Sequence, residues 1–152
     1  MEEALIKRIL PNSPEAEQSV IGSMIMDREA ILIASEILTG DDFYQNQYGI
    51  IFDTIVELCN EGKPVDLITL QDRLREKDLP PDISDMEYAK DLLDSVPTSA
   101  NVKYYAQIVS EKAMLRRLIK VSEEIANTCY LDKQSTEAVS YTHLTLPTTS
   151  RV

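Results

Sequence analysis

The residues of this chain that could do acid–base or metal chemistry are mainly carboxylates, and Asp41 and Asp42 form the most suggestive pair. Two carboxylates can act as general acid and general base, or hold a metal ion, when they converge in a pocket with divergent pKa values. No histidine, cysteine or third carboxylate cluster supports that reading here. We therefore interpret the pair as a turn and helix cap, and the following aromatic residues, Phe43 and Tyr44, as core.

The other side chains that commonly serve as nucleophiles or metal ligands are scarce. The chain has two cysteines, Cys59 and Cys129, and a single histidine, His143. The cysteines are far apart and fall at apolar helical positions, where a free thiol behaves as a small hydrophobe. The sequence also lacks a Gly-x-x-x-x-Gly-Lys-Ser/Thr loop, which would cradle nucleotide phosphates. We predict no catalytic residue, no metal ligand and no cofactor-binding residue in this chain.

Composition and charge favour a helical protein that contacts other proteins. The length of 152 residues fits one domain with an appendage. The chain has only four glycines, fewer than a protein with many tight hairpin turns would need. The formal net charge of −11 repels a nucleic-acid backbone on average. A local basic cluster, formed by Lys112, Arg116, Arg117 and Lys120, is interpreted as a solvated helix face. No apolar run approaches the roughly 18 residues of a membrane span, and no secretion signal is present, so we expect a cytoplasmic protein.

Apolar residues recur at helical spacing along most of the chain and are separated by turn residues. After an N-terminal arm over 1–12, Ser13 and Pro14 are typical of a helix start, with Ser13 as the N-cap. Asp66 and Asp85 are suitable caps for two later helices. The pattern predicts helices over about 14–26, 28–38, 48–59, 67–74, 86–93 and 101–130.

The last of these helices is the longest, about 40 Å at 1.5 Å per residue. Its apolar face changes along its length. Val102, Tyr105 and Val109 define one arc near its start, and one residue of the pair Tyr104 and Tyr105 is expected in the core. Beyond residue 114 the apolar residues occupy a different arc: Met114, Leu115, Leu118, Ile119, Ile125 and Cys129. This rotation indicates a helix that packs first on its own domain and then on something else.

The final residues have a different character from the rest of the chain. The segment 139–152 contains no acidic residue and no helical period, and 139–144 resembles the translation of a transposon end used in sequencing-library adaptors. We interpret 139–152 as a non-native tail. His143 then has no part in any catalytic argument.

Several motifs, taken in their order and spacing, resemble one known family. They are Arg8–Gly22 with its Pro-Glu-Ala-Glu run, Asp42–Tyr44, Ile51–Phe52, Gly62–Leu70 and Ala100–Val109. Each motif is weak alone, but together they resemble the N-terminal domain of DnaB-type bacterial replicative helicases. The resemblance extends from Arg8 to about Ala138.

The resemblance implies an all-α fold: a small orthogonal bundle of five to six helices over 13–100, with a long helix as the first arm of a helical hairpin over 101–138. In that family the domain dimerises and assembles as a trimer of dimers, forming a collar on a hexameric motor where primase docks; a helicase loader is a further candidate partner. The second arm of the hairpin would begin near Ser135. Candidate protein-interface residues are Leu115, Leu118, Ile119, Ile125 and Cys129.

Two functions of different classes are compatible with these features. The first is a non-catalytic collar domain of a replicative helicase, which mediates ring assembly and primase docking. ATP, Mg²⁺ and 5′–3′ DNA unwinding would belong to a motor domain that this chain lacks. The alternative is a free-standing acidic helical adaptor that binds primase or modulates helicase assembly. A downstream reading frame with a phosphate loop would favour the first, and a stop codon near residue 138 the second.

Overall fold

The computed structural model describes residues 9–80, 86–94 and 99–131 of the chain. This part of the chain is helical and contains no strand, as the sequence predicts. The elements are α2 (Pro14–Met26), α3 (Arg28–Ile37), the short 3-10 helix η1 (Gly40–Asp42), α4 (Asn46–Asn60), α5 (Leu67–Glu76), α7 (Met86–Asp94) and α8 (Val102–Leu131). The chain divides into two compact units, and the boundary between Ala113 and Met114 lies inside α8.

Local capping explains where the helices of the first unit begin. The Ser13 hydroxyl accepts a hydrogen bond from the Ala16 N–H at 3.3 Å, and Pro14 occupies the first helical position. The Asp66 carboxylate accepts from the Thr69 N–H at 2.8 Å, while the Thr69 hydroxyl accepts from the Asp66 N–H at 3.0 Å. Such reciprocal bonds satisfy backbone donors that the helix itself leaves unpaired. The predicted caps Ser13 and Asp66 are thus confirmed.

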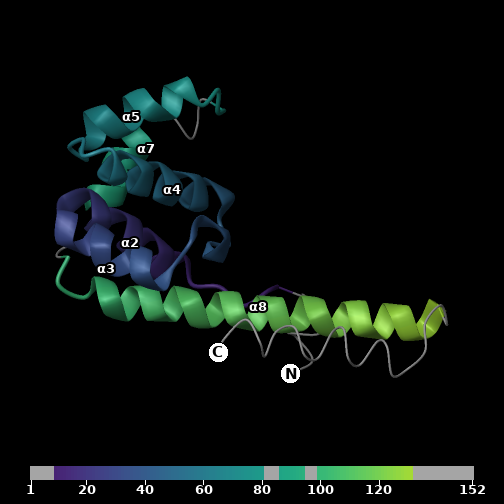
Figure 1. Cartoon of the computed structure of the whole chain (residues 1–152). Helices are drawn as coiled ribbons and strands as arrows, with labels where there is room; N and C mark the ends of the chain where they lie inside the picture. Colours follow the sequence, from purple (N-terminus) through teal and green to yellow (C-terminus); the bar gives the residue numbers. More distant parts are fainter. Residues whose placement is uncertain (1–8, 81–85, 95–98, 132–152) are drawn as a thin grey trace. The chain divides into compact units, whose positions relative to one another are not determined.

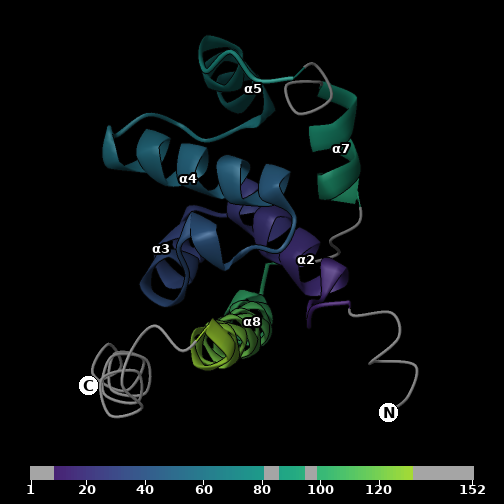
Figure 2. The ribbon, with the colours of Figure 1, turned by 90° about the vertical axis from the view of Figure 1, so that its right-hand side faces the viewer.

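Helix α2 lies at the centre of the first unit. It contacts α3, α4 and α7, and α5 contacts both α4 and α7 (Figures 1 and 2). The core is built from the apolar stripes of these helices together with the first turns of α8. Its fully buried side chains include Ile21, Met24, Ile31, Ile51, Ile55, Leu70, Leu92 and Val109. Burial of such stripes stabilises the unit by roughly 1.5–3 kcal/mol for each large side chain.

The segment between α3 and α4 turns tightly because two glycines approach each other. A Cβ on Gly49 would collide with the carbonyl oxygen of Gly40. This approach lets Phe43 enter the core, where its ring packs against Phe52 with centroids 5.2 Å apart. Tyr44, predicted to be core, is instead 42% exposed, because the neighbouring Phe43 takes the inward position.

Some sequence predictions fall outside the described residues. They concern the Asp85 cap, residues 1–8 of the N-terminal arm, His143 and the tail over 139–152. Within the described residues, none of the helices has the length and apolar character that crossing a membrane requires.

Candidate functional site

The first turns of α8 belong to the core of the first unit. Val102, Ala106, Val109 and Ala113 are buried, at helical steps of three and four residues. One tyrosine of the pair packs against the core and the other does not, as the sequence predicts. Tyr105 is the core residue, whereas Tyr104 is 66% exposed.

Beyond the unit boundary, α8 presents an apolar stripe to solvent. Leu115, Leu118 and Ile119 are 44%, 47% and 36% exposed, respectively. Ile125 is half-buried and Cys129 is exposed. At 100° per residue, these five predicted interface residues fall within an arc of about 120°. We call these five residues the distal stripe.

The two apolar faces of α8 lie on opposite sides of the helix. Counted at 100° per residue, the centre of the distal stripe is about half a turn away from the buried face of Val102, Ala106, Val109 and Ala113. Contiguous exposed aliphatic side chains on a soluble protein commonly mark an interaction surface. The distal stripe is therefore the first candidate site.

The acidic pair Asp41 and Asp42 has a structural role. The Asp42 carboxylate is buried and accepts a hydrogen bond from the Thr39 N–H at 2.8 Å, which closes the capping box of η1. Asp41 is exposed. These observations confirm the interpretation as turn and cap. Within 9–80, 86–94 and 99–131, no three histidine, cysteine or acidic side chains converge in a way that could hold a metal ion.

One buried carboxylate, Glu17, was not predicted from the sequence. Glu17 is 1% exposed. Its Oε2 accepts from the Tyr44 N–H at 3.0 Å, and its Oε1 accepts from the Gln45 N–H at 3.1 Å. The signal was present, because Glu17 lies on the same arc of α2 as Ile21 and Met24. This contact joins two motifs of the sequence, Pro-Glu-Ala-Glu and Asp-Phe-Tyr.

A network of ion pairs joins α5 to the end of α4. The Arg73 guanidinium, with a side chain only 12% exposed, contacts Glu57 at 2.7 Å and Glu61 at 2.6 Å, and Lys77 contacts Glu57 at 2.8 Å. Hydrogen bonding to Lys77 lowers the pKa of Glu57, and hydrogen bonding to Arg73 lowers the pKa of Glu61. The hydrogen bonds that Arg73 donates to Glu61 and Glu57 raise the pKa of Arg73. This network fixes the loop that follows α4.

The pKa of Asp53, on α4, is raised, in contrast to those of Glu57 and Glu61. Burial raises its pKa, partly offset by a hydrogen bond from the Gly40 backbone. A Cβ on Gly40 would collide with the Asp53 carboxylate. Asp53 is therefore held against η1.

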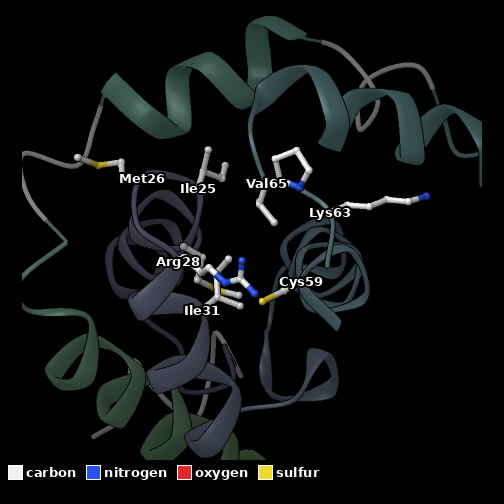
Figure 3. A pocket seen from close by; sticks show the side chains of 9 residues that line it. Ile25, Met26, Arg28, Ile31, Cys59, Lys63 and Val65 are labelled. Carbon is white, nitrogen blue, oxygen red and sulfur yellow. The ribbon is translucent and has the colours of Figure 1, made fainter. Parts of the chain in front are cut away.

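A second candidate site is a small pocket between α2, α3, the end of α4 and the loop after it. Its volume is about 100 Å³. Figure 3 shows Ile25 and Ile31 on one side and Cys59 and Val65 on the other. The Arg28 guanidinium is directed toward Cys59 in this view. Pockets for drug-sized ligands are typically about 300–1,000 Å³, so this one is too small for a nucleotide.

Comparison with known proteins agrees with the resemblance seen in the sequence. The family model described as the DnaB-like helicase N terminal domain matches residues 9–111. The chain is 43% identical over 130 residues to the replicative DNA helicase DnaB of Geobacillus stearothermophilus, covering 86% of this chain and 29% of that protein. It is 39% identical over 137 residues to the replicative DNA helicase DnaC of Bacillus subtilis, covering 90% of this chain and 30% of that protein. The chain thus spans about 30% of the length of these curated relatives.

Solved structures show the same fold. The N-terminal domain of the DnaB helicase from Mycobacterium tuberculosis is similar with a TM-score of 0.85 and 33% identity, covering 90% of this chain and 96% of that one. A DnaB-like replicative helicase, described together with its interactions with primase, is similar with a TM-score of 0.74 and 26% identity. That match covers 88% of this chain and 31% of the helicase.

Proposed function

Because the chain belongs to the family of DnaB-like helicase N-terminal domains, we propose that it is the non-catalytic collar domain of a replicative DNA helicase, located in the cytoplasm. The observation that carries this proposal is the family match over residues 9–111 in a chain that spans about 30% of its helicase relatives. ATP hydrolysis and DNA unwinding are assigned to a motor domain elsewhere in the full-length protein. The chain contains no phosphate-binding loop of its own.

The distal stripe supports a role in self-association. Three of its aliphatic residues are each more than one third exposed, and burying a large aliphatic side chain contributes roughly 1.5–3 kcal/mol. We assign Leu115, Leu118, Ile119, Ile125 and Cys129 to a contact with a second hairpin helix and a neighbouring subunit. The residues 101–138 would then form the first arm of that hairpin and the start of its connection.

Primase is the second proposed partner. The support is the structural similarity to a helicase that is described with its primase interactions. The net charge of −11 disfavours the alternative that this domain holds DNA by its backbone, since such binding needs clustered cations. We therefore assign the domain to protein contacts at the replication fork.

The experiment is a paired measurement of self-association and primase binding. Sedimentation equilibrium should show concentration-dependent association, and calorimetry should show binding to the primase of the same genome. The double variant Leu118→Glu and Ile119→Glu should weaken self-association at least tenfold, because two carboxylates would be buried in an apolar contact. Leu32→Glu is a matched control, since Leu32 is a large aliphatic residue 55% exposed on α3. Absence of primase binding by both the chain and the full-length protein would refute the docking role.

A further inference from the structure

One face of α8 follows a seven-residue repeat that extends beyond the distal stripe. Alternating steps of four and three residues along this unbroken helix (Figure 1) connect a set of positions that are mostly apolar. They are Tyr104, Ile108, Glu111, Leu115, Leu118, Ser122, Ile125 and Cys129. Counted at 100° per residue, they fall within an arc of about 100°, and we call them the α8 seam. A helix with this repeat packs along another helix over several turns.

Most of the α8 seam is accessible to a second helix. Tyr104 is 66% exposed, and Glu111, Ser122 and Cys129 are exposed, whereas Ile108 is half-buried. The centre of the seam is about half a turn away from the buried face of the first turns of α8. The core of the first unit therefore packs on the opposite side of α8 and leaves this side for a partner.

The α8 seam is complementary to itself when two copies of the helix run in opposite directions. When the two helices are centred on each other between Arg116 and Arg117, apolar positions face apolar positions and the two polar positions face each other. The pairs are Tyr104 with Cys129, Ile108 with Ile125, Glu111 with Ser122, and Leu115 with Leu118, each with the second residue on the second copy. By two-fold symmetry, every pair occurs twice.

Other arrangements of the two helices leave the polar residues without a suitable partner. A parallel pair in register places Glu111 against Glu111, which are like charges. An antiparallel pair shifted by seven residues places Glu111 against Cys129 in one direction, or against Leu115 in the other. A polar group that is buried without a hydrogen bond is costly. In the centred antiparallel pair, the Ser122 hydroxyl, which donates to the Leu118 carbonyl at 2.8 Å in the structure, can donate to the Glu111 carboxylate instead.

From this self-complementarity, we propose that α8 pairs antiparallel with α8 of a second copy of this chain, and that Glu111 and Ser122 set the direction and register of the contact. A polar residue inside a helix–helix contact specifies register at a cost in stability. The proposal rests on the self-association assigned above to the distal stripe. It adds the first turns of α8 to that contact and names the residues that select one arrangement.

Disulfide trapping tests the direction of the helices, because Cys129 is exposed and faces Tyr104 of the second copy in the proposed register. In a glutathione redox buffer, Tyr104→Cys should form an intermolecular disulfide between position 104 and Cys129, identified by mass spectrometry of tryptic fragments. This bond should exceed the bond between two Cys129 residues at least about tenfold, because a disulfide needs Cα atoms within about 7 Å. Lys103→Cys, exposed on the same turn but outside the seam, is the matched control and should give at least about tenfold less disulfide to Cys129.

The double variant Glu111→Leu and Ser122→Leu tests the role of the polar pair. It should tighten self-association at least about tenfold in sedimentation equilibrium, because two apolar side chains replace two polar ones in the contact. In the Tyr104→Cys background, its preference for the disulfide between position 104 and Cys129 over the bond between two Cys129 residues should fall at least about fivefold. Glu123→Leu, at an exposed position of α8 outside the seam, should leave both measurements unchanged.

A bond between two Cys129 residues as abundant as the bond to position 104 would overturn the proposal. So would an unchanged preference in the double variant, or a chain that stays monomeric at millimolar concentration. Calorimetry with primase separates these results from a failure of the collar function. A monomeric or differently paired chain that still binds primase would refute the antiparallel seam and leave the docking role in place.

Discussion

The carboxylate of Glu17 in α2 accepts a hydrogen bond from the backbone N–H of Tyr44, 27 residues later in the chain, at 3.0 Å. A second bond from the Gln45 N–H, at 3.1 Å, uses the other oxygen of the same carboxylate. Hydrogen bonds to a charged acceptor are stronger than neutral ones, and unpaired buried donors are costly. Glu17 therefore fixes the entry into α4 against α2.

Replacing Glu17 should destabilise the first unit strongly. We expect Glu17→Ala to lower the free energy of unfolding by about 1–3 kcal/mol, because two partly buried N–H groups would lose their acceptor. Glu17→Gln, which keeps one carbonyl oxygen, should cost less than Glu17→Ala. Urea denaturation measures both, with Glu15→Gln as the control at an exposed position of the same helical turn. A similar loss for the Glu15 and Glu17 variants would contradict this role.

The two glycines of the turn should differ in their tolerance of alanine. Gly49→Ala sets a Cβ against the Gly40 carbonyl, a backbone atom that cannot move independently, and should cost about 1–3 kcal/mol. Gly40→Ala meets the Asp53 carboxylate, which can rotate away, and should cost less. Thermal unfolding of both variants tests this order of destabilisation. A Gly49→Ala protein as stable as the parent would show that the fold does not require the close approach of Gly49 to the Gly40 carbonyl.

The ion-pair network predicts how stability depends on pH. Glu57 and Glu61 have lowered pKa values in the folded state, so their contribution is present above the unfolded pKa of about 4.3 and is lost as pH falls below it and through the lower folded pKa. Arg73→Gln should lower stability at pH 7 and flatten this decline. Arg75→Gln, an exposed arginine of the same helix, is the control.

The effect of Asp53 on the pH dependence of stability is opposite to that of Glu57 and Glu61. Its raised pKa penalises the folded state when the group is ionised, so folding gains stability as pH falls through the folded pKa. Asp53→Asn should therefore make the acid-induced decline of the parent steeper. Urea midpoints at several pH values measure both effects, and an unchanged slope in Arg73→Gln would contradict the assignment of the decline to Glu57 and Glu61.

Amide hydrogen exchange should differ between the distal part of α8 and α4. In dilute protein, the amides of 115–130 should exchange faster than those of 48–58, because the distal stripe is exposed whereas α4 buries Ile51 and Ile55. Raising the protein concentration should slow exchange in 115–130 if the stripe associates. Equal protection of both segments at low concentration would refute the idea that the stripe lacks a partner.

The interpretation of residues 139–152 as a non-native tail can be tested by sequencing the gene. Sequencing the genomic locus across codon 138, from a library made without transposon tagging, should replace the codons of 139–152 with a frame that continues toward a Gly-x-x-x-x-Gly-Lys-Ser/Thr motif. The same threonine-rich tail followed by a stop codon would instead favour the free-standing adaptor.

Local patterns were sufficient to predict most helices and two of their caps, whereas the Asp27 cap of α3 was not predicted. Ser13, Asp66 and the α4 stripe each depend on neighbours within a few residues, where spacing and capping preferences act. The hydrogen bond between the Tyr44 N–H and Glu17 is a contact across 27 residues that no local preference encodes. The same is true of the pocket at Cys59, which three helices and a loop form together.

The two opposite apolar faces of α8 restrict how this helix can change in length. Inserting or deleting one residue between Ala113 and Leu115 would turn the distal stripe by 100° relative to the buried face at Val102 and Val109. Seven residues, close to two full turns, would return it to within about 20° of its present direction. An insertion or deletion of seven codons in this part of the gene should therefore be tolerated better than a change of one, two, five or six codons, each of which turns the stripe by about 100° or more.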